Sequence, residues 1–323
     1  MGKNTAVLLL AYGGPETMED IEPFLRRLLR RETIPPPMLQ RVQEKYRQIG
    51  SGSPLPAICR SIRRKLAAAL PAGGVELPVY LAFRYSNPGI FAVVEMLTEI
   101  GVERVMALSL SPHSSTISTR AYFQALEQAA GGQELEIVPV DDWFRHPGYI
   151  DCLVSRIRKA AAANEFALDD PRTAVVFSAH SIPQSYLDRG DTYVEEIQEN
   201  IRLVMGRLPG TRHYLAYQSQ GKAPGPWLEP RVETLLPELN RQSGHENFLL
   251  VPVSFAMDHL ETLYDLDVEI IPELRRLPGV RAARIAMAND DEDFIAMLAA
   301  AVGEKLAAGG GARSTTTHSG RNG

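Results

Sequence analysis

Short, almost wholly apolar runs alternate along this chain with longer segments of helical period, and this alternation narrows the possible folds more than any other feature. Between the runs, apolar residues recur at helical spacing, for example over residues 19–31 and 91–100. Strands that are apolar on both faces are typical of parallel sheets covered by helices on both sides. The sequence therefore predicts an α/β fold with right-handed crossovers. The candidate strands are residues 6–11, 79–83, 105–110, 136–140, 174–177, 214–217, 248–253 and, with a weaker pattern, 282–287.

The eight candidate strands divide into four and four, which indicates two similar halves with a cleft between them. A turn at Pro147-Gly148 marks the break, so we expect the halves to be residues 1–150 and 151–307. The sequences SPHS at 111–114 and SAHS at 178–181 each follow a strand, at the edge where open α/β sheets bind ligands. We expect a last helix over 290–306, capped by Asn289 and able to pack back on the first half, and a disordered polar tail over 308–323.

The composition argues against several classes of protein. The 323 residues carry a formal net charge of −5, so no basic surplus indicates nucleic acid as a partner. The two cysteines, Cys59 and Cys152, are too few for a disulfide framework, a structural zinc site or a cysteine-ligated iron–sulfur cluster. No apolar run approaches the roughly 18 residues of an integral membrane segment, and the apolar start is too short for a signal peptide. We therefore expect a globular protein of the cytoplasm.

His180 is the first candidate for chemistry, because a buried strand delivers it to the ligand-binding edge of the predicted second sheet. A histidine in such a place more often only hydrogen-bonds within its loop, so the residue alone does not define a site. Its neutral imidazole can accept a proton near neutral pH, and it can also bind a metal ion.

Three carboxylates follow the strand at 248–253. Glu261, Asp265 and Glu269 are four residues apart, so an α-helix places them on one face. Apolar neighbours indicate that this face is half buried, although a solvated acidic stripe remains the alternative. Imidazole with carboxylates suits ferrous iron or zinc, and a row of carboxylates suits a hydrated divalent cation moving along it. We expect His259 on a different helical face, about 200° from Glu261.

Two glycine-rich segments border the predicted cleft. Tyr12 ends the first strand and precedes Gly13-Gly14-Pro15, a tight turn that lacks the dinucleotide fingerprint. The loop over 218–228 is rich in glycine and proline and carries Trp227, which could stack on a flat ligand or cover the core. Neither a hydrolase elbow nor a phosphate-binding loop is present in the sequence.

Together these segments resemble the ferrochelatase family of bacterial type, over residues 6 to about 306. The most specific motif is SAHSIP at 178–183, followed at a distance by DHLETLYD at 258–265. The sequences YQS at 217–219, PWL at 226–228 and GSPL at 52–55 also fit the family. The resemblance implies two Rossmann-like halves of chelatase type, each a four-stranded parallel sheet flanked by helices, with a porphyrin cleft between them.

The resemblance also implies roles for particular residues. His180 and Glu261 would face each other as the catalytic pair that binds the metal or handles protons, with Asp265 and Glu269 along the metal's route behind them. The coproporphyrin branch usually has arginine where this chain has Lys45. Tyr12 resembles the coproporphyrin type, whereas the glycines after it resemble the protoporphyrin type. The residues expected near the porphyrin are Tyr12, Arg30, Lys45, Tyr46, Ser53, Tyr122, Ser219 and Trp227.

The implied reaction is the insertion of ferrous iron into a porphyrin in haem biosynthesis, with coproporphyrin III slightly favoured over protoporphyrin IX. Iron is then a substrate, and we expect no tightly bound cofactor and no iron–sulfur cluster. We also expect a monomer that meets haem-pathway partners only transiently. Two alternatives remain from the sequence: a chelatase for cobalt or nickel with a sirohydrochlorin-like ring, and a non-catalytic carrier of haem or metal.

Overall fold

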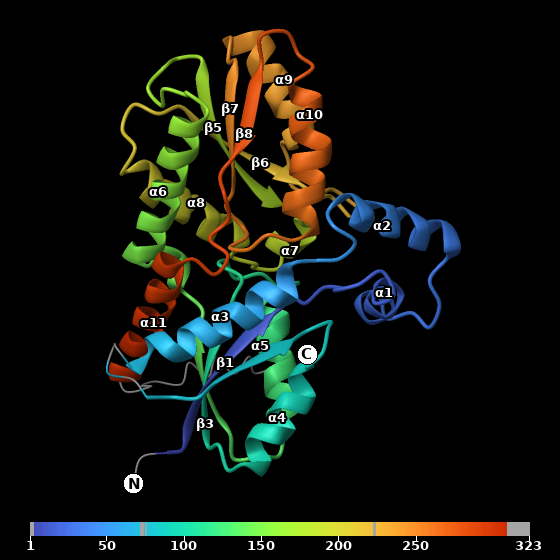
Figure 1. Cartoon of the computed structure of the whole chain (residues 1–323), viewed down its shortest axis with the longest axis vertical. Helices are drawn as coiled ribbons and strands as arrows, with labels where there is room; N and C mark the ends of the chain where they lie inside the picture. The colour runs from blue at the N-terminus through green and yellow to red at the C-terminus, as the bar shows by residue number, and fades with distance from the viewer. Residues whose placement is uncertain (1–2, 72–73, 75, 222–223, 309–323) are drawn as a thin grey trace, which may run out of the picture.

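Two parallel four-stranded sheets form the centre of the molecule (Figure 1). The computed structural model describes residues 3–71, 74, 76–221 and 224–308. Both sheets have the same pattern of strand order, β2-β1-β3-β4 in the first and β6-β5-β7-β8 in the second. The strands of the first sheet are β1 (Thr5–Ala11), β2 (Val79–Phe83), β3 (Arg104–Ser109) and β4 (Glu136–Val140). Those of the second are β5 (Thr173–His180), β6 (His213–Gln218), β7 (Asn247–Pro252) and β8 (Arg281–Arg284).

Helices connect successive strands and cover both sheets. Around the first sheet lie α1 (Ile21–Leu29), α2 (Pro36–Gln48), α3 (Leu55–Ala69), α4 (Ile90–Glu99) and α5 (Thr119–Ala130). The short η2 (Trp143–Arg145) and α6 (Pro147–Ala163) lead to the second sheet. Around that sheet lie α7 (Gln184–Leu187), α8 (Tyr193–Met205), α9 (Val232–Ser243), the π-helix η3 (Glu261–Ile270), α10 (Ile271–Leu274) and the last helix α11 (Glu292–Ala307).

Strand β1 shows why its sequence is apolar without interruption. Val7 and Leu9 point into a core with α3, α6 and α11, whereas Leu8 and Leu10 point into a separate core with α4 and α5. Successive side chains of a strand point to opposite faces, so a strand buried on both faces needs apolar residues throughout. The larger of these cores continues into the second sheet, where it includes Phe177 of β5.

The last helix, α11, returns from the second sheet to pack against α3 and α6 and beside β3 and β4. Its Phe294 lies edge-on to Trp143, with ring centroids 5.7 Å apart. Arg156 of α6 anchors the start of the helix through ion pairs of 2.8 Å with Asp291 and Asp293. The chain's last described element thereby covers part of its first sheet.

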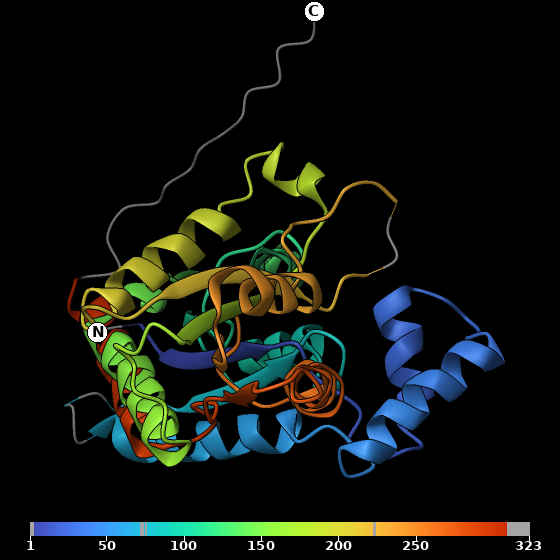
Figure 2. The same cartoon turned by 90° about the horizontal axis from the view of Figure 1, so that it is seen from above.

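Helices α1 and α2, residues 21–48, form an arm that stands away from the body of the molecule (Figures 1 and 2). A small apolar cluster holds the two helices together and includes Phe24, Leu25 and Tyr46. Leu260, directly before η3, packs against the same cluster. The arm thus begins in the first half of the chain and reaches the second.

The predicted α/β class and the two parallel four-stranded sheets are confirmed. The strands begin and end within a few residues of the predicted bounds; β5 is longer and continues to His180. The predicted cap of the last helix is wrong, because Asn289 has a positive φ of 49° and α11 begins after Asp291. The predicted boundary at residues 150 and 151 falls within α6.

Two further predictions concern the tail of the chain and membrane-spanning helices. Of the tail predicted over 308–323, residues 309–323 lie outside the described residues. In the described part of the chain, no helix combines the length and the apolar character that crossing a membrane requires.

Candidate active site

The carboxyl ends of strands from both sheets meet at one cavity of about 300 Å³. Tyr12 follows β1 and Leu110 follows β3, while His180 ends β5. The loop after β7 supplies a further wall, from Ser254 to Met257. In parallel sheets this edge is where ligands bind, so the fold itself directs the cavity to this place. The walls are mostly apolar, with a few polar side chains between them, as in many sites for organic ligands.

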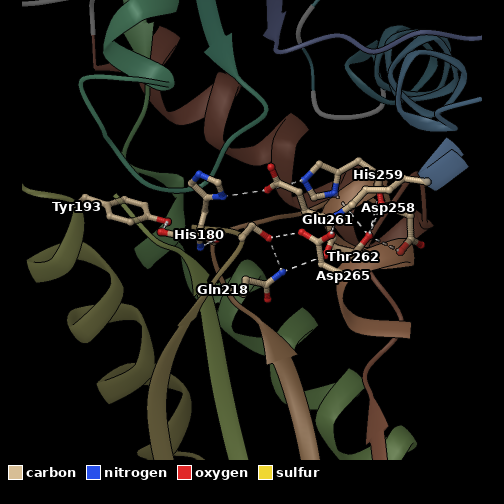
Figure 3. A network of polar contacts seen from close by, with 11 residues as sticks. His180, Tyr193, Gln218, Asp258, His259, Glu261, Thr262 and Asp265 are labelled. Carbon is tan, nitrogen blue, oxygen red and sulfur yellow. Dashed lines mark hydrogen bonds and ion pairs between the residues drawn. The ribbon is translucent and has the colours of Figure 1, made fainter. Parts of the chain in front are cut away.

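His180 and Glu261 face each other at the cavity wall, as predicted (Figure 3). Nδ1 of His180 lies 3.1 Å from Oε2 of Glu261, and the two side chains are 26% and 31% exposed. The position of His180 is fixed from behind: its backbone N–H donates to Ser254, and its carbonyl accepts from the Tyr193 hydroxyl. The pair therefore joins the end of β5 to the start of η3.

His259 also contacts Glu261, contrary to the prediction that it lies on another helical face. Its Nε2 is 3.7 Å from Oε2 of Glu261, so this carboxylate lies between two imidazoles (Figure 3). The prediction was wrong because it extended the helix back to residue 259, whereas η3 begins at Glu261. The sequence does contain a signal for this contact, because the histidine lies two residues before the carboxylate. The turn before the helix brings the two side chains together.

The pair perturbs the pKa values of its members in opposite directions. Burial alone would lower the pKa of His180, but the Glu261 carboxylate outweighs burial and raises it. Burial alone would raise the pKa of Glu261, but the charge on His180 lowers it to about 2. For His259 burial dominates, so its pKa lies below the ordinary value. The cavity thus contains one ionised carboxylate, one imidazole with a raised pKa and one imidazole with a lowered pKa.

The loop that carries His259 and Glu261 is held by a polar network. Arg284 of β8 donates to Asp258, at 2.9 Å, and also pairs with Asp267 of η3. The other oxygen of Asp258 accepts from Asn289. These contacts fix the turn before η3, because each charged group has an opposite charge or an amide as its partner.

Asp265 lies beyond Glu261 and belongs to a second polar cluster. Its Oδ2 accepts a 2.6 Å hydrogen bond from Ser219, and its Oδ1 lies 3.1 Å from Nζ of Lys45. The same ammonium lies 3.8 Å from Oε2 of Glu269, whose side chain is 50% exposed. The three carboxylates follow one side of η3, as predicted, although the helix is a π-helix rather than an α-helix. Burial raises the pKa of Asp265.

The opposite wall of the cavity comes from the first sheet. Tyr12 and Tyr122 both line it, and burial raises the pKa of each, so both hydroxyls stay protonated at neutral pH. Gly13 follows with a φ of +93°, where a Cβ would lie 2.6 Å from Oγ of Ser86. Only glycine fits this turn, which positions Tyr12 at the carboxyl end of β1. His113 lines the same wall.

Several predicted site residues lie outside the cavity lining. Lys45 pairs with the carboxylates described above, and Tyr46 is buried within the arm. Arg30 ends α1 at a φ of 53° and is exposed. Ser53 is buried beneath Gly14, and Trp227 lies beside Pro183. Conversely, tertiary packing brings Tyr85, Tyr193 and Met257 into the cavity lining, and no local sequence pattern predicts this.

The divided α/β fold, with imidazole and carboxylate groups at a cavity between the sheets, is similar to the fold of chelatases. The structure of the sirohydrochlorin chelatase SirB from Bacillus subtilis subspecies spizizenii matches it with a TM-score of 0.51, at 11% identity, over 94% of this chain and 97% of that chain. The Ferrochelatase family model matches residues 4–306. The chain therefore belongs to the ferrochelatase family, whose members insert iron into a porphyrin in haem biosynthesis.

Two relatives illustrate this membership. A ferrochelatase of Geobacter sp. (strain M21) is 34% identical over 317 residues, which cover 93% of this chain and 98% of the relative. A coproporphyrin III ferrochelatase of Oceanobacillus iheyensis is 32% identical over 305 residues, which cover 94% and 97%. The similarity thus extends over nearly the full length of each relative.

Proposed function

We propose that the protein inserts ferrous iron into coproporphyrin III, with His180 and Glu261 acting on one face of the ring and Tyr12 on the other. One observation carries this assignment: the His180–Glu261 pair and Tyr12 line the same cavity from two different sheets. A planar ring between them would present its central nitrogens to an imidazole and a carboxylate. This is the donor set that suits ferrous iron in the absence of thiolates.

The reaction removes two N–H protons from the porphyrin and forms bonds from its nitrogens to iron. His180 accepts the two ring protons one after the other and passes each to solvent, because the adjoining carboxylate makes it more basic than an ordinary imidazole and its side chain is 26% exposed. Glu261 remains ionised and stabilises the imidazolium or the incoming cation. Both groups are partly buried at the cavity wall, so their electrostatic interaction is stronger than between charges in open water.

Asp265 and Glu269 extend from this pair toward the surface, and we assign them to the route of the metal. The side chain of Glu269 is 50% exposed, so the row reaches the surface at its outer end, four residues beyond Asp265. Oxygen ligands suit a divalent cation that still carries water.

The choice of coproporphyrin III rests on the relative from Oceanobacillus iheyensis and on Tyr12. Coproporphyrin carries four propionates, whereas protoporphyrin carries two propionates and two vinyl groups. We further propose that the enzyme works in the cytoplasm as a monomer, without a tightly bound cofactor, and meets its haem-pathway partners transiently.

Absorbance spectroscopy tests the proposal. The purified chain is mixed anaerobically with ferrous iron and coproporphyrin III, protoporphyrin IX or sirohydrochlorin. We expect the highest kcat/KM with coproporphyrin III, loss of insertion in His180→Ala, and retention of porphyrin binding in that variant. His213→Ala is the matched control, because His213 is exposed at the opposite end of the second sheet. An active His180→Ala enzyme would contradict the assignment of the base.

A further inference from the structure

Lys45 occupies a position that its sequence context does not explain. It lies in the last turns of α2, on the arm, yet its ammonium points at the π-helix of the other half. Oδ1 of Asp265 is 3.1 Å from Nζ, Oε2 of Glu269 is 3.8 Å away, and the Tyr264 ring centroid lies at 4.4 Å. Two carboxylates and an aromatic face thus surround one positive charge.

In this arrangement the ammonium group of Lys45 occupies the place of a cation beside the carboxylate row. Both carboxylate oxygens of Asp265 already have partners: Oδ1 accepts from Lys45, and Oδ2 accepts from Ser219. A divalent cation that follows the row needs the same oxygens. Lysine suits a replaceable cation, because its ammonium is a compact charge on a flexible stem and holds no fixed fork geometry. Its side chain is 36% exposed, so it can leave toward solvent.

The same contacts attach the arm to the second half. In the described parts of the chain, the ion pairs between the arm and that half are the two made by Lys45. The remaining ion pairs of the arm are internal, such as Arg47 with Glu44. A cation that displaces Lys45 therefore also removes the electrostatic attachment of α2 to η3. Apolar packing of Leu260 against the arm remains.

We propose that Lys45 is a gate for metal entry: it closes the Asp265–Glu269 portion of the row until a divalent cation displaces it, and its displacement loosens the arm. This inference rests on the proposed function of the carboxylate row, and it gives Lys45 a role in addition to its expected place near the porphyrin. Lys45 is a positioning residue in this account, since it acts through Asp265 and Glu269.

Zinc binding to the porphyrin-free full-length chain tests the gate by isothermal titration calorimetry. Exposed and half-buried ion pairs are worth up to about 1 kcal/mol, so Lys45→Met should bind Zn²⁺ about three- to fivefold more tightly than the wild type. Lys45→Arg should stay near wild type. Arg47→Met is the matched control, because it removes a positive charge from the outer side of α2. In an Asp265→Asn background, Lys45→Met should give no gain.

Hydrogen exchange supplies a second measurement. Zn²⁺ should increase exchange of the amides of residues 36–48 in the wild type, whereas in Lys45→Met exchange should be high already and insensitive to zinc. Unchanged or weaker zinc binding in Lys45→Met, or wild-type exchange that ignores zinc, would overturn the gate. A higher KM for coproporphyrin in Lys45→Met with unchanged zinc affinity would show that Lys45 serves porphyrin binding instead of metal entry. Neither zinc measurement needs turnover, so a wild type that inserts no iron would refute the proposed function alone.

Discussion

Glu261→Gln separates the charge of the central carboxylate from its shape. The substitution keeps the side chain's size and removes the negative charge that lies 3.1 Å from Nδ1 of His180. In the wild type this charge outweighs burial and raises the pKa of His180 above its ordinary value. In the variant, burial still lowers the pKa of His180, whereas the negative charge that raises it is gone. The pKa of His180 must therefore fall.

The size of the change follows from the geometry. Two unit charges 3.1 Å apart interact by about 5 kcal/mol at an effective dielectric constant of about 20. Because the two side chains are 26% and 31% exposed, solvent screens much of this interaction. We therefore expect the pKa of His180 to fall below the ordinary value of about 6.5, because burial then acts without the Glu261 charge that outweighs it.

Nuclear magnetic resonance of the ¹⁵N-labelled imidazoles measures this pKa without requiring turnover. Comparison with His180→Asn assigns the resonance, and Glu199→Gln is the control because it neutralises an exposed carboxylate paired with Arg202. The pH dependence of insertion should follow: an acidic limb set by His180 moves to lower pH when the carboxylate is neutralised. A pKa for His180 that stays at or above 6.5 in Glu261→Gln would refute the electrostatic reasoning.

Three stability predictions follow from packing, each measured by urea unfolding. Gly52→Ala should lower the free energy of unfolding by about 2–3 kcal/mol, because a Cβ would lie 2.0 Å from the carbonyl oxygen of Glu16; a change below about 0.5 kcal/mol would contradict this. Arg156→Leu should cost about 2 kcal/mol through its lost ion pair with Asp293, and an unaltered midpoint would show that the pair is not stabilising. His113→Phe should be neutral or stabilising by about 1 kcal/mol, because within the described structure neither buried ring nitrogen has a hydrogen-bond partner; a loss above about 2 kcal/mol would reveal a missing partner.

The fold could be predicted from the sequence because its main signal is local. A strand covered on both faces must be apolar throughout, and β1 and β7 carry that signal in their own residues. The end of β8 was harder to predict, since the apolar run continues to Met287 after the pairing with β7 has stopped at Arg284. The π-helix was not predictable either, because side chains four residues apart share a face in both helix types.

The positions of the site residues could be predicted from the sequence only where a local motif determines where the side chain lies. His180 and Glu261 were found because each lies at the end or start of an element that the sequence defines. The contact of Lys45 with Asp265 was not predicted, since the two residues are 220 positions apart and the arm that joins them has no sequence signature. His259 was misplaced through an error of one or two residues in where the helix begins.

Helix α11 covers part of the first sheet. The first half of the chain can therefore bury that face of the sheet only after the last helix has been synthesised. The contacts of Phe294 with Trp143 and Tyr149 join residues about 150 positions apart. During synthesis, a ribosome adds about 5–20 residues per second, so the apolar side chains awaiting α11 stay uncovered for roughly ten seconds or more. The nascent first half is therefore a natural client for chaperones, and a truncated chain that ends before residue 292 should aggregate rather than fold.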